Sequence, residues 1–223
     1  MSVTPNKEKR PLKTEPKLGI EPNAEQKEVV ATVYNKDVTF VLGDVASGKT
    51  AISAYIALTM FRKKMVNKIW ITRPILKNNL GILPGTIDEK LNPYVFPIIQ
   101  NFQVLQGKQQ TEKMMENGDI QIIPIDVAKG ITFMDSFVIV DEFCDMDYQD
   151  FRTILTRLGK TSKMIFCGSV EQIDRSMKNT TCYHETKKLK KLDVVGYHTL
   201  TANHRNPILT EILNFLEKNG TES

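Results

Sequence analysis

Cysteine is scarce in this sequence. The 223 residues include three, Cys144, Cys167 and Cys182, and they are far apart. Three scattered cysteines are too few for a disulfide framework, and none forms the close pairs that structural zinc sites use. We therefore expect reduced thiols, and we expect neither a disulfide scaffold nor a zinc module.

Long apolar runs are also missing. No stretch of about 18 apolar residues, the length that a membrane-spanning helix needs, occurs in the chain. The first residues carry charges and prolines where a secretory signal would need its apolar segment. These absences predict a soluble, cytoplasmic protein with no membrane partner.

The bulk composition is typical of an ordinary enzyme domain. Hydrophobic residues make up 41% and charged residues 25% of the chain, which fits one α/β domain with a core large enough to fold alone. The net charge of +4 and the sequence pI of about 8.8 permit contact with nucleic acid. They do not favour it strongly, because nucleic-acid-binding domains often have a pI above about 9.

The first 20 residues differ from the rest. They combine three prolines with five lysines and arginines and carry almost no apolar side chains. Such a segment cannot bury enough surface to offset its chain entropy. We predict a flexible basic arm over residues 1–20, followed by a single domain over residues 21–223.

Within the domain, short β-rich runs alternate with helical patterns. Asn23 is a good cap for a first helix that passes through Gln26 and Val33. Strands that alternate with helices favour a mostly parallel sheet with helices on both faces. The predicted strands are Val38–Leu42, Lys68–Thr72, Ile120–Pro124, Phe137–Val140, Lys163–Cys167 and Val194–Leu200.

The strongest motif is the glycine-rich loop Gly43–Thr50, whose sequence GDVASGKT matches G-x-x-x-x-G-K-[ST] between a predicted strand and a predicted helix. Glycines let backbone N–H groups surround phosphate oxygens, and the following helix directs its positive end at the same charge. Lys49 is expected to reach the β- and γ-phosphates and Thr50 to hold Mg²⁺. The alternative is a strand-to-helix turn that happens to be rich in glycine. The predicted nucleotide contacts here are Gly43, Asp44, Val45, Ala46, Ser47, Gly48, Lys49, Thr50 and Ala51.

A second motif places two carboxylates at the end of a predicted buried strand. The sequence FVIVDE, Phe137–Glu142, delivers them where open α/β sheets bind their ligands. Asp141 suits the Mg²⁺ shell, and Glu142 suits the activation of an attacking water. By itself such an ending is often a solvated strand end. Together with the glycine-rich loop it predicts ATP hydrolysis.

Two further polar residues are candidates for catalysis. Gln172, shortly after the strand Lys163–Cys167, could sense the γ-phosphate, or it could be a surface residue at a turn. Arg205, before a predicted final helix, could supply the positive charge that phosphoryl transfer gains from an arginine, or it could be a plain surface arginine.

Taken together, these motifs resemble those of the PhoH-like proteins, from about Asn23 to Arg205. Beyond the two nucleotide motifs, the resemblance rests on short blocks that are more specific than a phosphate loop. They are Thr72-Arg73-Pro74, Leu80-Gly81-Ile82-Leu83-Pro84-Gly85, Gly130-Ile131-Thr132, Leu155-Thr156-Arg157-Leu158-Gly159 and Gln172-Ile173-Asp174.

The resemblance implies a RecA-like P-loop NTPase fold, related to the ATPase core of superfamily-one helicases. It implies ATP and Mg²⁺ as ligands, with Gln26 near the adenine. Similar proteins occur in bacteria and phages, are linked to phosphate starvation and RNA metabolism, and form ring-shaped oligomers. For this chain it implies single-stranded RNA or DNA as a partner, RNA being favoured, and a homo-oligomer such as a hexameric ring.

Residues for a nucleic-acid contact are less well defined. Thr72, Arg73 and Arg157 are the candidates. Arg73 ends a predicted strand on the ligand-binding edge, and related helicases place phosphate-contacting residues at comparable strand ends. For Arg73 the alternative is a structural salt bridge. The lysines near residue 190 are better explained as a solvated face. A two-lobed helicase is not expected, because the sequence after Arg205 has room for only one helix.

Two departures from the family pattern stand out. Ser169 replaces an acid that usually follows Gly168, and Phe143-Cys144 replaces the usual Ala-Gln. Asp44 also adds a negative charge near a polyphosphate if it faces inward. Because the core catalytic groups are present, we expect a slow ATPase. The alternatives are a small-molecule kinase on the same fold and a binding module that nucleotide locks.

Overall fold

The computed structural model describes residues 18–74, 87–169 and 182–202, together with 208, 211, 212 and 215. For 87–93 and 95 it describes the backbone alone. The basic arm up to residue 17, the block 80–85, Gln172 and Arg205 therefore lie outside the described residues. Leu18 and Ile20, at the end of the predicted arm, pack against the core, and the Gly19 amide donates to the Leu105 carbonyl at 3.0 Å.

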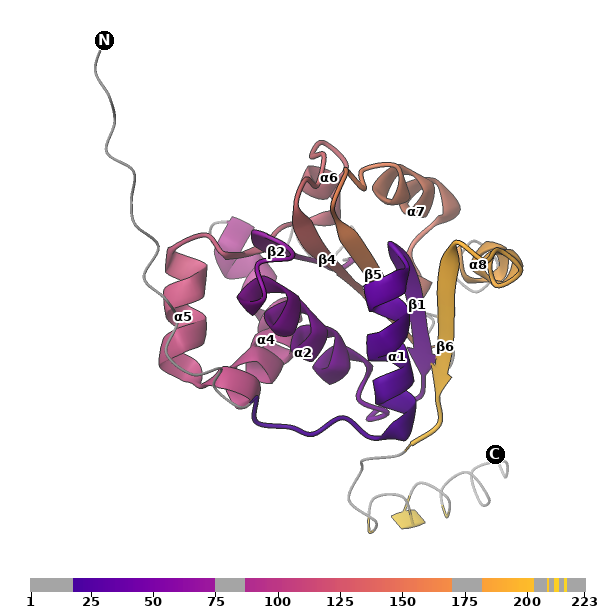
Figure 1. The fold of residues 1–223 in the computed structure, drawn as a ribbon, viewed down its shortest axis with the longest axis horizontal. Coiled ribbons are helices and arrows are strands. Elements are labelled where there is room, and N and C mark those ends of the chain that lie inside the picture. Colours follow the sequence, from indigo (N-terminus) through magenta and orange to yellow (C-terminus); the bar gives the residue numbers. More distant parts are fainter. Residues whose placement is uncertain are drawn as a thin grey trace, which may run out of the picture.

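A six-stranded sheet forms the centre of the molecule, in the order β3-β2-β4-β5-β1-β6 (Figure 1). Every neighbouring pair is parallel. The order does not follow the chain, so crossover connections carry the chain over the sheet. The strands are β1 Val38–Gly43, β2 Lys68–Thr72, β3 Ile120–Ile122, β4 Ser136–Asp141, β5 Lys163–Gly168 and β6 Val195–Leu200.

Helices cover both faces of this sheet. On one face lie α1 Ala24–Asn35, α2 Lys49–Arg62, α4 Ile87–Gln106 and α5 Lys108–Glu116; α1 and α2 are in front of the sheet in Figure 1. On the other face lie α6 Ile125–Ala128, the 3₁₀ turn η1 Phe143–Asp145, α7 Tyr148–Leu155 and α8 Tyr183–Leu189. The predicted α/β architecture, a parallel sheet with helices on both faces, is confirmed.

Alternation along the strands divides the core into two layers. In β4, Phe137 and Ile139 join the cluster under α2, whereas Val138 and Val140 join the cluster on the opposite face. Successive strand side chains point to opposite faces, so a strand covered on both sides must be apolar throughout. This is why the central strands carry continuous apolar runs instead of an apolar–polar alternation.

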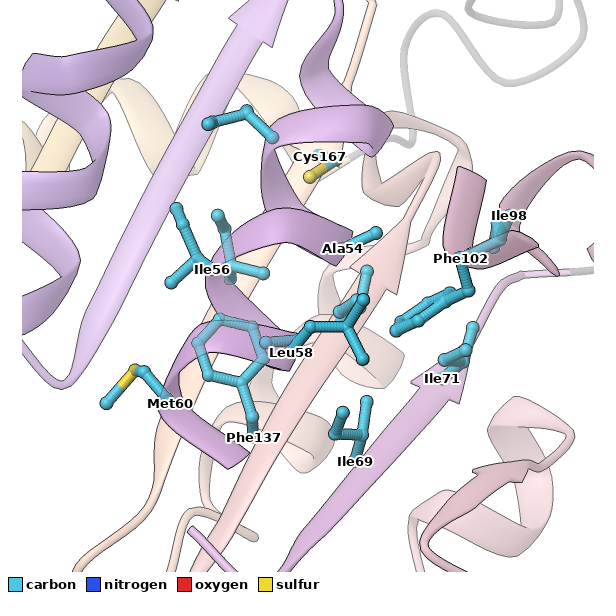
Figure 2. Packing of buried hydrophobic residues seen from close by; sticks show 14 of the residues in the cluster. Ala54, Ile56, Leu58, Met60, Ile69, Ile71, Ile98, Phe102, Phe137 and Cys167 are labelled. Carbon is cyan, nitrogen blue, oxygen red and sulfur yellow. The ribbon is translucent and has the colours of Figure 1, made fainter. Parts of the chain in front are cut away.

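Helix α2 is the main contact between the glycine-rich loop and the core. Figure 2 shows Ala54 and Leu58 of α2 facing Ile71 of β2, Phe137 of β4 and Phe102 of α4, and all five side chains are fully buried. Complete burial of a Leu or Phe side chain contributes about 1.5–3 kcal/mol. The helix that begins in the glycine-rich loop is therefore fixed firmly against the sheet.

Each strand begins and ends within two residues of its predicted bounds. All six are present, and β2 has the predicted bounds, while β3 stops at Ile122 because the 123–124 segment leads into α6. Asn23 is the N-cap of α1, as predicted, and its side chain accepts from the Gln26 amide at 2.9 Å. Among the described residues, no helix is both long enough and apolar enough to cross a membrane.

Candidate functional site

The glycine-rich loop connects β1 to α2 at the edge of the sheet where the parallel strands end. Gly48 has φ +84° and caps α2, a left-handed conformation that glycine adopts without strain. At Gly43 a β-carbon would lie 2.6 Å from both the Leu200 carbonyl oxygen and Ser47 Oγ. Close packing therefore requires glycine at position 43.

Lys49 lies inside this loop. Its Nζ donates to the carbonyl oxygens of Gly43 at 2.7 Å and Asp44 at 2.8 Å, and its side chain is buried. An ammonium group held among backbone carbonyls in the cradle can exchange them for phosphate oxygens, which carry full negative charge. The Asp44 side chain is exposed to solvent.

The acidic pair at the end of β4 reaches the same place. Thr50 Oγ1 donates to Asp141 Oδ1 at 3.2 Å, although the two residues are 91 positions apart. Asp141 is 4% exposed, and Glu142 follows it in a left-handed conformation with φ +50° and ψ +40°. A non-glycine residue is held in that conformation only where its surroundings enforce it, and functional sites are enriched in such positions.

Burial affects the pKa of both carboxyls. It raises the pKa of Asp141, an effect opposed by the Arg73 guanidinium, by the Thr50 hydrogen bond and by Lys49. Burial also raises the pKa of Glu142, and the neighbouring Asp141 charge adds to the rise. Because two buried carboxyls lie beside each other, a cation bound next to them would favour their charged forms.

Arg73 is part of this group. It follows β2, the neighbour of β4, and its Nη1 lies 3.7 Å from Asp141 Oδ2 and donates to the Tyr94 carbonyl at 3.1 Å. This is the structural salt bridge that the sequence left open as the alternative. A nucleic-acid contact by Arg73 therefore stays a prediction. The side chain that would make this contact is already paired with Asp141.

The other two nucleic-acid candidates, Thr72 and Arg157, lie at opposite edges of the sheet. The Thr72 side chain is 0% exposed, and its hydroxyl has no hydrogen-bond partner among the described residues. Arg157 lies at the end where β4 and β5 begin, where its carbonyl accepts from the Phe133 amide at 2.9 Å. The structure thus brings Thr72 and Arg73 to the edge of the glycine-rich loop and leaves Arg157 at the opposite edge.

Gln26 lies on the first turn of α1, at the same sheet edge as the glycine-rich loop. Its Oε1 accepts from the Asn23 amide at 3.1 Å and completes a capping box. The side chain is buried, and the adjacent Glu25 accepts from the amides of Thr201 and Ala202 after β6. Gln26 therefore has a capping role in this structure, and its predicted contact with adenine stays a prediction.

Metal binding here would use few protein ligands. Among the described residues, no three His, Cys, Asp or Glu side chains gather in a way that could hold a metal ion. Mg²⁺ typically takes one or two protein oxygens together with phosphates and waters. Thr50 and Asp141, already joined by a hydrogen bond, have the hard oxygen chemistry that fits this ion.

Sequence reasoning did not predict the pairing of Arg73 with Asp141 or the anchoring role of Glu25. It also singled out Ser169 only as a departure, although the Ser169 hydroxyl is buried without a hydrogen-bond partner among the described residues. The sequence showed that these positions are polar, but their partners come from distant segments.

A separate cavity of about 550 Å³, lined by residues such as Arg62, Lys113 and Met114, lies outside this group of site residues.

Comparisons with known proteins show the family to which the chain is similar. A family model described as "PhoH-like protein" matches residues 20–217. The PhoH-like protein of Bacillus subtilis (strain 168) is 33% identical over 199 residues, which cover 86% of this chain and 62% of that relative. Protein PhoH of Escherichia coli (strain K12) is 33% identical over 159 residues, covering 68% of this chain and 44% of that relative. The chain thus spans less than two thirds of the length of these relatives.

Solved structures show the same fold at low sequence identity. The Pif1 helicase from Candida albicans superposes with a TM-score of 0.50 at 14% identity, covering 89% of this chain and 44% of the helicase. The large terminase from a thermophilic bacteriophage gives a TM-score of 0.53 at 12% identity, covering 90% of this chain and 50% of the terminase. The α/β fold is therefore the RecA-like fold of P-loop ATPases.

Proposed function

Because this chain belongs to the PhoH-like protein family, we propose that it binds ATP with Mg²⁺ at the glycine-rich loop and hydrolyses it. The observation that carries the proposal is the hydrogen bond between Thr50 and Asp141 at 3.2 Å. It joins the helix that begins in the glycine-rich loop to the last residue of the strand that precedes Glu142. Phosphoryl transfer to water requires a phosphate cradle with carboxylates beside it, and here the cradle contacts one of the two carboxylates directly.

Each residue has a defined part in the reaction. Backbone amides of residues 43–50 and the Lys49 ammonium bind the β- and γ-phosphates. Thr50 and Asp141 would hold Mg²⁺, which supplies positive charge to the phosphate oxygens when it is bound. Glu142 accepts a proton from a water molecule while the water oxygen forms a bond to the γ-phosphorus. The bond to the β–γ bridging oxygen breaks, and ADP and inorganic phosphate leave.

The partial burial of Glu142 supports its role as the base. Burial and the Asp141 charge raise its pKa, so the carboxylate is a stronger proton acceptor than a solvated glutamate. The left-handed backbone at Glu142 turns the chain away from the strand axis directly after Asp141. The two neighbouring carboxylates can therefore serve separate purposes.

We also propose a coupling to single-stranded nucleic acid, with RNA preferred to DNA. Arg73 supports it, because its side chain is 27% exposed at the edge where β2 ends and it contacts Asp141 directly. A nucleic-acid phosphate that attracts the Arg73 guanidinium would draw its positive charge away from Asp141 and so alter the nucleotide site.

The predicted homo-oligomer, with Arg205 acting on a neighbour in a ring, rests on a residue outside the described structure. Mass measurement with ATP bound tests it, and a species that is monomeric throughout would contradict it.

The central experiment is steady-state ATP hydrolysis by the wild type and by Glu142→Gln, each with and without single-stranded RNA or DNA. The substitution keeps the side chain's size and removes the base, so the rate should fall on the order of 10²-fold or more while ATP still binds. Glu112→Gln, on the exposed face of α5, is the matched control and should hydrolyse ATP at the wild-type rate.

Four other outcomes would reject parts of the proposal. Hydrolysis that is unaffected by Glu142→Gln would remove Glu142 from the mechanism. Nucleotide binding with no turnover under any condition would indicate a module that nucleotide locks, and turnover only with an added hydroxyl acceptor would indicate a kinase. A rate that RNA and DNA leave unchanged would remove the coupling but not the ATPase.

A further inference from the structure

Ser169 carries a buried hydroxyl that the structure leaves unsatisfied. The residue follows β5 directly and is 1% exposed. Its Oγ is shielded from solvent and has no hydrogen-bond partner among the described residues. Burying a hydroxyl without a partner costs free energy, and native proteins keep few such groups unless a ligand, an ion or a water completes them.

The sheet register locates this hydroxyl beside the phosphate cradle. Leu42 of β1 lies opposite Gly168 of β5, so the next pair in the same register is Gly43 and Ser169. On the other side of β5, Asp141 lies opposite Cys167. Ser169 therefore follows the strand that separates the start of the glycine-rich loop from the acidic pair at the end of β4.

The pleat indicates which face Ser169 occupies. Cys167, two residues earlier, has its Sγ 2.9 Å from Ser53 Oγ of α2 and 4.0 Å from the Lys49 carbonyl oxygen. Side chains two apart along a strand share a face. Continuation of the strand geometry by one residue thus puts Ser169 on the α2 face, where Lys49 and Thr50 lie.

The charge of the surroundings favours a neutral donor at this position. Asp141 and Glu142 already bring two carboxyls to the site, and a third acid would repel a triphosphate. A serine hydroxyl can donate to a phosphate oxygen, whereas a carboxylate can only accept.

We propose that the Ser169 hydroxyl donates a hydrogen bond to the γ-phosphate of the bound nucleotide and thereby makes the site prefer a triphosphate to a diphosphate. The inference rests on the proposed function and adds a specificity residue to it. ADP has no γ-phosphate and leaves the hydroxyl unsatisfied. ATP satisfies it, and hydrolysis followed by phosphate release takes the partner away again.

The test compares the affinities of two nucleotides for three forms of the protein. The dissociation constants of Mg-ADP and of the Mg-bound β,γ-imido analogue of ATP are measured for the wild type, Ser169→Ala and Ser169→Thr. Ser169→Ala should weaken binding of the triphosphate analogue by about 10- to 100-fold, the usual effect of one hydrogen bond to a charged group, and change ADP binding less than twofold. Ser169→Thr retains a hydroxyl and should restore most of the preference.

Ser162 is a matched control at the other end of β5. It is also a buried serine, but its hydroxyl accepts from the Ser136 amide at 3.0 Å and donates to the Phe133 carbonyl at 2.8 Å. Ser162→Ala should lower the melting temperature and leave the ratio of the two affinities unchanged. Ser169→Ala should not lower the melting temperature, because the hydroxyl it removes has no hydrogen-bond partner within the described part of the chain.

The possible failures can be told apart. If Ser169→Ala weakens ADP and the triphosphate analogue equally, or weakens neither, the γ-phosphate contact is wrong although the nucleotide site stands. If Ser169→Ala lowers the melting temperature as Ser162→Ala does, the hydroxyl has a structural partner and the inference fails. If the wild type binds neither nucleotide, the proposed function itself fails, and the inference fails with it.

Discussion

Thr50 Oγ1 donates a hydrogen bond to Asp141 Oδ1 at 3.2 Å and so connects the two halves of the nucleotide site. Thr50 belongs to the first turn of α2, and Asp141 is the last residue of β4. The core packing around α2 fixes the distance between them. The two oxygens that would hold Mg²⁺ therefore lie within hydrogen-bonding distance of each other.

The first prediction concerns this pair. Thr50→Val keeps the shape of the side chain and removes the hydroxyl, whereas Thr50→Ser keeps the hydroxyl. We expect ATP hydrolysis at saturating Mg²⁺ to fall on the order of 10²-fold in Thr50→Val and to change little in Thr50→Ser. The hydrolysis rate of each variant is measured as a function of Mg²⁺ concentration, and EDTA should abolish hydrolysis in the wild type. Equal rates for the valine and serine variants would remove Thr50 from the metal site.

The second prediction concerns Arg73 and Asp141, whose closest charged atoms are 3.7 Å apart. The guanidinium partly compensates the burial of the carboxyl, so removing either group should leave the other poorly paired. In a double-mutant cycle with Arg73→Gln and Asp141→Asn, we expect an interaction energy of about 1 kcal/mol in the free energy of unfolding, without nucleotide.

The same Arg73→Gln protein also separates the two roles considered for this residue. Its affinity for single-stranded RNA is measured against salt. A lower affinity with a shallower salt slope would show a phosphate contact in addition to the salt bridge. Additive free energies in the cycle would show that the ion pair does not stabilise the fold and would contradict the second prediction.

The strands and the nucleotide motifs were predictable because their signals are local. Each strand is a short β-rich run between helical patterns, and the glycine-rich loop is recognised by eight consecutive residues. The bounds differ by a residue or two where a strand end depends on its neighbours. β4 extends to Asp141, for example, because β5 pairs with it up to Cys167.

The contacts between segments were not predictable in the same way. Arg73 meets Asp141 because β2 lies beside β4, and that neighbourhood follows from a strand order that departs from the chain order. No local pattern encodes it. Arg157 shows the reverse case, since it was grouped with Arg73 by residue type although α7 leads it to the opposite edge of the sheet.

The third prediction compares two phenylalanines of α4. Phe102 is 0% exposed and packs under α2 (Figure 2), whereas Phe96 is 52% exposed. Phe102→Ala should lower the free energy of unfolding by about 3–5 kcal/mol, because it removes buried surface and leaves a cavity. Phe96→Ala should change it by less than about 1 kcal/mol. Urea unfolding followed by circular dichroism measures both. A similar loss for the two variants would mean that α4 does not pack as described.

The fourth prediction concerns stability against pH. His198 of β6 is half-buried, and its Nε2 lies 2.7 Å from Thr32 Oγ1 of α1. Burial lowers the pKa of His198 below its ordinary 6.5, with Glu28 opposing the shift. The unfolded chain therefore binds the proton more readily than the folded protein, so the free energy of unfolding should decrease as the pH falls through about 6.5.

The measurement is the melting temperature at about pH 7.5 and pH 5.5 for the wild type and two variants. His198→Gln keeps a polar group beside Thr32 but cannot titrate, so its melting temperature should fall less than that of the wild type. His184→Gln is the control, because His184 is exposed and meets water in both states. If His198→Gln loses as much stability between the two pH values as the wild type does, the imidazole is not a source of the pH dependence.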